Sequence, residues 1–564
     1  MIEWNAVTRR DHLVGLSLCI LWTGILMSNS DSVGIPRDES FYLYAADRTA
    51  DWYERLADPA VRSFSKKEID RGFKYNHEHP VLMKTLFGLS HRFLHERFGW
   101  IKQGLTAYRF PTMLMAGLSL WLAWLLGIMV RNRLVGFVAA LALAFMPRVF
   151  FHSHLACFDE PVTFMWLAGV YTFIRASRSR AWAIAAGVTL GFGLATKLNI
   201  FFLPFTLLCV AIVDVYCFRA QTGRATVDGE GRGPLTYYVW IAISMVVLGL
   251  LVFFIHWPWL YYETIPRLRF YVGFHARHVH YPVDYLGHLF YKPPFPVHFP
   301  FLMTLFTVPA GTIILGVIGI GVLVQRAIKI TDMSRARRVL ELAILANLIV
   351  PVIVIALPNT PIFGGTKHWM PAMPFFAICA GIGLAHLVDR LMPDFKALTR
   401  NRIGYLLAVI MLTPAAWATA RYGDHGPAYF NGLVGGPPGA AALGLPRNFW
   451  GYSTVSILPT INAETGKKPY VFWHKATQGS IDAYKANGLL KTGVRYTGDW
   501  TAEFSDWAVY HDQMEKLPEE VDIWRAYGRD WPVDGYFIDG VQLMSVYRKE
   551  GSSYGKKPVD EALQ

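Results

Sequence analysis

Long apolar stretches recur along most of the chain, each separated from the next by a short polar connection. A helix needs ~20 mainly apolar residues to cross a hydrocarbon layer ~30 Å thick. The pattern therefore predicts about eleven membrane-spanning helices within residues 1–419. Their expected ranges are 12–28, 106–130, 134–150, 158–174, 182–196, 198–217, 237–256, 301–325, 339–357, 369–388 and 403–419.

Lysine and arginine gather in alternate connections between these spans. The basic connections are residues 9–10, 131–133, 175–180, 219–232, 326–338 and 389–402. The short connections between them, 151–157 and 358–368, carry only Lys367. Because cytoplasmic loops of membrane proteins carry the excess of lysine and arginine, the N-terminus is predicted to be cytoplasmic. The N-terminal apolar stretch is read as a retained first span, because no small-residue cleavage site follows it cleanly.

Three longer segments then face the other side of the membrane. Segments 29–105 and 257–300 are rich in aromatic residues, histidine and proline, which predicts loops and helices lying on the membrane surface. The segment 420–564 contains short alternating stretches such as "KPYVFWH" and "DWAVYH". This pattern predicts a small soluble α/β domain outside the cytoplasm.

Composition agrees with a polytopic membrane protein. The chain is 53% hydrophobic and 17% charged, whereas soluble domains carry about 25% charged residues. Its net charge of +13 suits contact with anionic lipid. Lysine and arginine form no patch with interleaved aromatic residues, so nucleic acid is not an expected partner. The five cysteines show no CxxC spacing, which argues against disulfides and a structural zinc site. The layout favours a bacterial inner membrane.

Ionisable side chains gather at the predicted outer ends of the spans, and such residues are functional candidates in a membrane protein. The set consists of Asp38, Glu39, His77, His79, Arg109, Asp159, Lys197, Lys367 and His368. Each has an ordinary structural explanation when taken alone. Arg109 and Lys367 can snorkel to headgroups, and Asp159 can be a favourable acid in the first turn of a helix. Carboxylates and cations together on one face instead suit an anionic, lipid-linked substrate at the outer leaflet.

Two other functions compete with an enzyme. A transporter or flippase of lipid-linked sugars usually places charged sites near the bilayer midplane, whereas the mid-span regions here are apolar. A scaffold protein, whose tail recruits partners, leaves the outer charges unexplained. An active site at the membrane surface fits the charge distribution better than either.

Several short motifs are similar to those of one enzyme family. They are "PRDESFYLYAA", "NHEHPVLMKTLFGL", "YRFPTML", "CFDEPVTFMWLA" and "GLATKLNIFFLPF", in this order. Together they resemble the integral-membrane GT-C glycosyltransferases, specifically the protein O-mannosyltransferase and aminoarabinose-transferase-like group (glycosyltransferase family 39-like). The resemblance implies a GT-C-like membrane domain over 1–419 and a polyprenyl-phosphate-linked sugar donor. "HEHPV" departs from the consecutive prolines usual in the family.

The resemblance also implies roles for the charged residues. Asp38 would be the general base on an acceptor hydroxyl in an inverting transfer, with Glu39 sharing this task or holding a cation. Asp159 would orient a cation or contact the acceptor, which is a lipid, glycan or protein. No cofactor is required; a divalent metal bound by Glu78 and His79 is an open possibility, since their spacing is not diagnostic. The departing phosphate would be stabilised by cationic and imidazole groups. These are Lys197, Arg109, His77, His79, Lys367 and His368.

Overall fold

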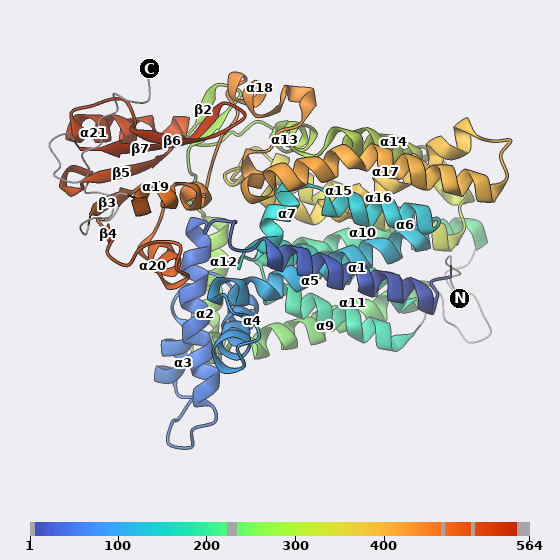
Figure 1. Ribbon diagram of the computed structural model, residues 1–564. Helices are drawn as coiled ribbons and strands as arrows, with labels where there is room; N and C mark the ends of the chain where they lie inside the picture. The colour runs from blue at the N-terminus through green and yellow to red at the C-terminus, as the bar shows by residue number, and fades with distance from the viewer. Residues whose placement is uncertain (1–5, 178, 223–233, 464–468, 498–501, 550–564) are drawn as a thin grey trace.

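The bundle consists of long helices that run side by side, and a smaller α/β unit sits at one end of it (Figure 1). The structure is a computed structural model that describes residues 6–177, 179–222, 234–463, 469–497 and 502–549. Parts of the basic connections at 178 and 223–233 lie outside the described residues, as do the tail residues 464–468, 498–501 and 550–564.

Every predicted span contains a helix. The bundle helices are α1 (Arg9–Ser28), α5 (Gly104–Val130), α6 (Arg133–Ala144), α7 (Pro147–His154), α8 (Asp159–Ala176), α9 (Arg180–Leu194), α10 (Leu203–Thr222), α11 (Pro234–Ile255), α13 (Phe299–Thr307), α14 (Ala310–Ile328), α15 (Arg335–Ala356), α16 (Met373–Leu391) and α17 (Ala397–Tyr422). The predicted polytopic helical fold is therefore confirmed.

The number of spans stays a prediction. Within the described residues, eight helices are long and apolar enough to cross a membrane, or nine if α6 and α7 count as one span bent by 68°. Helix α8 is not among these eight because charged residues occupy both of its ends, and α9 is not among them because it has only 15 residues. The predicted span 301–325 is divided into α13 and α14 at Pro309, which has no N–H to continue a helix.

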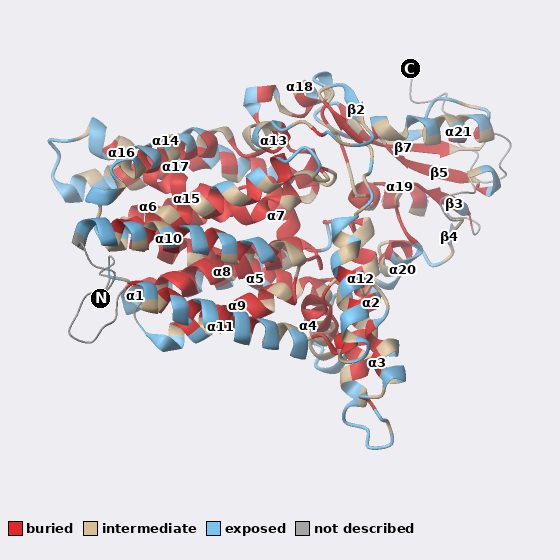
Figure 2. Cartoon of the chain, turned by 180° about the vertical axis from the view of Figure 1, so that it is seen from behind, coloured by how far each residue is buried: buried red, intermediate tan, exposed pale blue. Residues whose placement is uncertain are grey.

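Burial distinguishes central from peripheral helices. The apolar window is 72% buried in α5 and 89% buried in the segment containing α16, but only 28% buried in α11. Figure 2 shows the buried residues along the inside of the bundle and exposed ones on its outer faces. Helices α14 and α16 approach closely at Gly383, where an added Cβ would lie 2.0 Å from the carbonyl oxygen of Leu315.

The outward segments fold into short elements around one end of the bundle. Segment 29–105 contains α2 (Arg37–Arg55), α3 (Lys66–Phe73), α4 (Leu82–Ser90) and the π-helix η1 (His91–Arg97). Segment 257–300 contains η3 (Pro258–Tyr261), α12 (Thr264–Ala276) and the hairpin β1 (Val283–Tyr285) and β2 (His288–Phe290). Helix α2 crosses the end of the bundle nearly at right angles to its helices (Figure 1). This orientation is the one expected of a helix that lies along a membrane surface.

The tail contains the predicted α/β unit. Its five-stranded sheet has the order β4-β3-β5-β7-β6, with β3 parallel to both β4 and β5. The strands are β3 (Tyr470–Trp473), β4 (Arg495–Tyr496), β5 (Trp507–His511), β6 (Asp534–Ile538) and β7 (Val541–Arg548). The accompanying helices are α18 (Gly436–Ala442), α19 (Leu458–Ala463), α20 (Gln478–Ala486) and α21 (Leu517–Tyr527). The remaining described elements are short 3-10 turns between these helices and strands.

Candidate functional site

A cavity of about 640 Å³ lies between the tail and the end of the bundle beside it, and the N-terminus of α2 opens into it. Asp38, in the first turn of α2, lines this cavity. Its Oδ2 lies 3.5 Å from Nζ of Lys367, which belongs to the 3-10 turn η5 (Gly365–His368). The Asp38 side chain is 39% exposed and that of Lys367 only 8%. A carboxylate that is accessible to a ligand thus faces a nearly buried cation.

The indole of Trp450, contributed by the tail, completes this group. Nζ of Lys367 lies 3.9 Å from the centroid of the Trp450 ring, a favourable cation–π distance. The carbonyl oxygen of Trp450 also accepts a 2.8 Å hydrogen bond from the backbone N–H of Arg37. Sequence reasoning missed Trp450, because the 412 positions that separate it from Asp38 are bridged only in the folded chain.

Glu39 points away from the cavity and into the bundle. Glu39 and Arg109 form an ion pair in which both side chains are 0% exposed. Arg109 donates from Nε and Nη2 to the two carboxylate oxygens, at 2.8 and 2.7 Å. Its other three N–H groups donate to the carbonyl oxygens of Ser30, Val33 and Gly34. Since a guanidinium has five N–H groups, none remains for a substrate phosphate.

Asp159 and Lys197 form a second pair at the predicted outer ends of the spans. Nζ of Lys197 donates to Oδ1 of Asp159 at 2.6 Å, and Nδ1 of His152 lies 3.8 Å from Oδ2. Asp159 starts α8, and Lys197 precedes the 3-10 turn η2 (Leu198–Phe202), so two helix ends meet here. Lys197 remains 19% exposed, whereas Asp159 is almost buried. The sequence predicted both residues but not their contact or the neighbouring His152.

A third group surrounds His79, just before α4. Lys84 is 2% exposed and donates to the carbonyl oxygens of Asn76 and His79, at 2.7 and 2.8 Å. Nε2 of His275, on α12, lies 3.0 Å from the Glu78 carbonyl oxygen. The pKa of His79 is lowered well below its usual range by burial first, and then by the basic side chains Lys84, His275, Lys197 and Lys367. His79 is therefore a neutral imidazole near pH ~7, and would contact a phosphate as a hydrogen-bonding group rather than as a cation.

The two remaining predicted histidines are held by local contacts. His77 lies with Nδ1 2.6 Å from the Lys74 carbonyl oxygen and stacks on Phe270 with ring centroids 4.7 Å apart. Nε2 of His368 contacts the carbonyl oxygen of Phe363, and burial lowers the pKa of His368 to about 3. His368 is therefore uncharged at neutral pH and is better suited to shaping the turn that carries Lys367 than to supplying charge.

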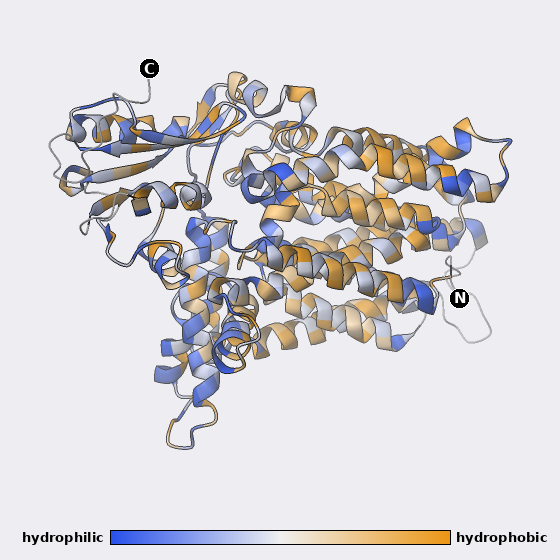
Figure 3. Cartoon of the chain, viewed as in Figure 1, coloured by the Kyte–Doolittle hydropathy of each residue, from blue (hydrophilic) through white to orange (hydrophobic). Residues whose placement is uncertain are grey.

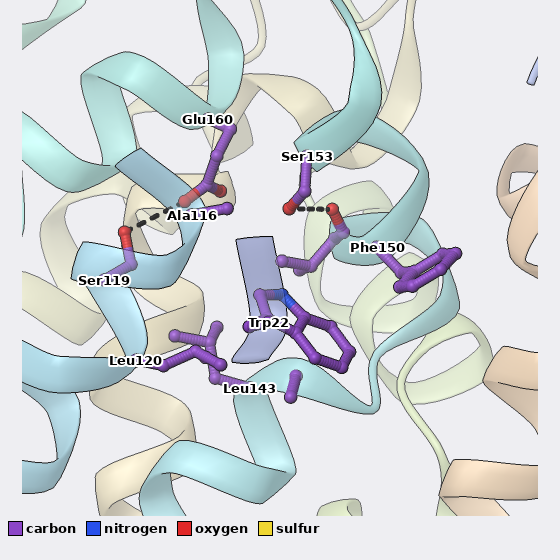
Figure 4. A pocket seen from close by; sticks show the side chains of 10 residues that line it. Trp22, Ala116, Ser119, Leu120, Leu143, Phe150, Ser153 and Glu160 are labelled. Carbon is purple, nitrogen blue, oxygen red and sulfur yellow. Dashed lines mark hydrogen bonds between the residues drawn. The ribbon is translucent and has the colours of Figure 1, made fainter. Parts of the chain in front are cut away.

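Two observations limit what else the site can hold. Among the described residues, no group of three or more histidine, cysteine, aspartate or glutamate side chains is arranged to bind a metal ion. A second cavity beside Glu160 and Ser119, shown in Figure 4, has a volume of only about 10 Å³, which is about one water molecule. The large cavity at Asp38 is therefore the candidate substrate site.

The family model of dolichyl-phosphate-mannose-protein mannosyltransferase matches residues 94–224. This stretch includes Arg109, Asp159 and Lys197. A comparison with curated protein sequences finds no significant match to the chain.

The chain is also similar to three solved structures. Crystalline ArnT from Cupriavidus metallidurans, bound to undecaprenyl phosphate, is 13% identical, with 95% of this chain and 97% of that chain covered and a TM-score of 0.47. The apo oligosaccharyltransferase of Archaeoglobus fulgidus is 13% identical, with coverages of 92% and 72% and a TM-score of 0.49. The S. cerevisiae Pmt1-Pmt2 protein O-mannosyltransferase complex, bound to the sugar donor, is 14% identical, with coverages of 46% and 35% and a TM-score of 0.36. The family match over residues 94–224 confirms the predicted resemblance of this chain to the GT-C glycosyltransferases of the protein O-mannosyltransferase group.

Proposed function

We propose that this chain transfers a sugar from a polyprenyl-phosphate donor to an acceptor hydroxyl at the outer face of a membrane. The observation that carries the proposal is the position of Asp38, whose carboxylate lies in the large cavity 3.5 Å from Lys367. The family match supports a glycosyltransferase.

Asp38 is the general base of the proposed reaction. The acceptor hydroxyl donates a hydrogen bond to the carboxylate, and its proton moves to Asp38 as the hydroxyl oxygen attacks the anomeric carbon. The bond between that carbon and the phosphate oxygen breaks, and the polyprenyl phosphate leaves as an anion. Because a single carboxylate acts and no glycosyl-enzyme intermediate forms, the configuration at the anomeric carbon inverts.

Positive charge for the departing phosphate comes from Lys197 and Lys367. Fixed charges in a site shielded from water stabilise developing charge strongly, because they need not reorganise during the reaction. Asp159 orients Lys197 through the 2.6 Å contact, and Asp38 and Trp450 orient Lys367. His79 offers a further hydrogen-bonding group near them, since both ammonium groups help burial to lower its pKa, whereas the N–H groups of Lys84 already donate to Asn76 and His79.

Arg109 and Glu39 act through position rather than by touching substrate. Together they hold segment 30–39 against the bundle, and this segment contains Asp38. Their ion pair therefore fixes the start of α2 and the direction of the catalytic carboxylate. A divalent metal at Glu78 and His79 remains an open part of the proposal, which is tested by measuring transfer with and without a chelator.

The proposed setting is a bacterial inner membrane, with the N-terminus in the cytoplasm and the tail outside it. The prenyl chain of the donor would lie among the membrane lipids beside the bundle. The acceptor would approach through the cavity between bundle and tail.

A transfer assay in proteoliposomes tests the proposal against a flippase. The purified full-length chain would receive a panel of radiolabelled polyprenyl-phosphate sugars and a membrane extract as acceptor. Transfer requires the label to leave the prenyl phosphate and appear on another molecule. Label that crosses the bilayer while still attached to the prenyl phosphate would instead establish a flippase and overturn the proposal.

A further inference from the structure

Two strained backbone positions meet in the wall of the large cavity. Trp450 has φ +75° and Lys475 has φ +63°, in the left-handed region that bulky residues rarely adopt. The turns that contain them lie against each other: a Cβ added to Gly451 would lie 2.7 Å from the Lys475 carbonyl oxygen. Strain of this kind costs of order 1–3 kcal/mol per residue and concentrates at functional sites.

Both strained residues line the cavity. Trp450 packs on the catalytic pair at one end, through its 3.9 Å contact with Lys367. Lys475 lies toward the tail end, where its Nζ is 3.8 Å from Oε1 of Glu519. The two turns therefore join the proposed catalytic group to a second polar group supplied by the tail.

This second group is hydrogen-bonded to strand β5 on one side and is accessible from the cavity on the other. His474, at 2% exposure, accepts a 3.1 Å hydrogen bond on Nδ1 from the His511 backbone N–H. Its Nε2 lies 2.9 Å from Oε2 of Glu519, and Lys516 donates to Oε1 at 2.9 Å. Glu519 is nevertheless 41% exposed. A carboxylate and two ammonium groups are thus fixed where a ligand in the cavity can reach them.

The remaining lining limits the class of ligand. Five lysine and arginine side chains and five aspartate and glutamate side chains line the cavity, so their formal charges balance. An acceptor that carries several phosphates would need an excess of positive charge. The lining also contains the aromatic residues Tyr281, Phe299, Phe363, Phe449, Trp450 and Phe472. Aromatic rings interspersed with fixed hydrogen-bonding groups suit the apolar faces and the hydroxyl rim of a sugar.

We infer that the tail end of the cavity is the acceptor subsite of the proposed glycosyltransferase and that it binds an uncharged glycan. This inference rests on the proposed function and identifies its acceptor. Lys475 and Glu519 hydrogen-bond hydroxyl groups of the glycan, and the strained turn at Trp450 presents its reactive hydroxyl to Asp38. Neither Lys475 nor Glu519 takes part in the chemistry.

The test compares three full-length proteins in nanodiscs: wild type, Lys475→Gln and the matched control Lys485→Gln. Lys485 lies on α20 and does not line the cavity. A radiolabelled polyprenyl-phosphate sugar is supplied with three separate fractions of a membrane extract: phosphorylated lipids, protease-sensitive polypeptides and neutral glycans. Label is expected on the neutral glycans. The Lys475→Gln change should raise the half-saturating glycan concentration about tenfold, because it removes one charged hydrogen bond to the glycan. The half-saturating concentration of the donor should stay unchanged.

Three results separate the possible failures. Asp38-dependent transfer to phosphorylated lipid or polypeptide would overturn the acceptor class while leaving the proposed function in place. Equal half-saturation by glycan in wild type and Lys475→Gln would overturn the location of the subsite. Absence of transfer to every fraction with every donor would overturn the proposed function itself.

Discussion

Asp38 and Glu39 are adjacent in the sequence but face opposite environments. Successive residues of a helix are turned by about 100°, so one carboxylate lies in the cavity while the other enters the bundle. The family resemblance left Glu39 two roles, to share the task of Asp38 or to hold a cation, and the contact with Arg109 matches the second. The structure separates a ligand-facing carboxylate from one that is fully engaged with Arg109 and with the backbone N–H of Ala156, at 2.7 Å.

The change Glu39→Gln should destabilise the protein by about 3–5 kcal/mol, because it leaves the guanidinium of Arg109 buried without its counter-charge. Thermal unfolding in detergent, followed by tryptophan fluorescence, measures this loss. Asp38→Asn serves as the control and should unfold close to wild type, since Asp38 is 39% exposed. Equal unfolding of Glu39→Gln and wild type would show that the pair does not hold the start of α2.

At the residue scale, the sequence predicted which charges gather at the outer face but not which of them touch. Asp159 was predicted to orient a cation or to contact the acceptor, without a named partner, because its 2.6 Å contact with Lys197 depends on helix ends that meet only in the bundle. Lys84, His275 and Trp450 were missed. Lys84 is part of an apolar helix, and His275 and Trp450 belong to aromatic segments with many equivalent residues. No signal in one sequence singles them out.

At the scale of elements, the start of α2 is held between the bundle and the tail. On the tail side, the hydroxyl of Tyr484 accepts a 2.7 Å hydrogen bond from the Ile35 N–H, and Oγ1 of Thr477 donates to Oγ of Ser40 at 2.7 Å. The Arg37 N–H bonds to Trp450 as described above. These contacts make the tail part of the support of the proposed site and argue against an independent recruiting module.

Tyr484→Phe should therefore lower the rate of transfer. The change removes the hydroxyl that accepts the hydrogen bond of the buried Ile35 N–H, which costs about 1–3 kcal/mol. Since the loss falls on the segment that directs Asp38, turnover should decrease while half-saturation by the donor stays unchanged. Tyr496→Phe, in the edge strand β4, is the matched control. Equal turnover in all three proteins would contradict a bracing role for α20.

Acidification should weaken the tail. His511 on β5 is 0% exposed, and burial lowers its pKa to about 3, with neighbouring His474 and Lys475 adding to the effect. In the unfolded chain His511 takes up a proton near pH ~6.5, whereas in the folded tail the buried imidazole stays neutral at that pH. Stability is therefore lost as pH falls from about 6.5 toward 3, by up to about 1.4 kcal/mol per pH unit.

Thermal unfolding between about pH 7 and pH 5 measures this dependence. His511→Gln should flatten it, because glutamine does not titrate, whereas His288→Gln on the exposed strand β2 should retain the wild-type slope. A melting temperature that is constant with pH in wild type would contradict the assignment of buried neutral histidines.

At the scale of the whole molecule, charge and hydropathy divide the bundle into three zones. Apolar residues fill its middle, and hydrophilic residues occupy both ends (Figure 3). At the end away from the tail, Asp214 and Arg338 form a pair at 2.9 Å in which both side chains are 0% exposed. The opposite end holds the cavity and the tail.

Cysteine labelling tests the predicted orientation. In a Cys209→Ser background, Ala57→Cys lies between α2 and α3, and Thr331→Cys lies between α14 and α15. A membrane-impermeant maleimide should label the first variant in sealed spheroplasts and the second only after lysis, as the excess of positive charge in cytoplasmic loops requires. The reverse pattern would place the proposed active site in the cytoplasm.

The overall architecture was largely predictable, and the arrangement of the cavity was not. Apolar runs located a helix in every predicted span, because the hydrocarbon layer constrains length and composition directly. The breaks at Pro309 and between α6 and α7 arise from local backbone geometry that a hydropathy pattern averages out. The cavity depends on how residues near positions 38, 148, 367, 450 and 475 converge, and that convergence depends on tertiary packing.

The most direct measurement is the initial rate of sugar transfer by Asp38→Asn beside wild type and Asp58→Asn. Asp58 lies in the exposed turn after α2 and serves as the matched control. If Asp38 is the general base, its replacement should lower the rate by about 10²–10⁴-fold without a change in melting temperature, and Asp58→Asn should match wild type. A rate for Asp38→Asn within about twofold of wild type would contradict the catalytic assignment, since loss of a general base costs far more.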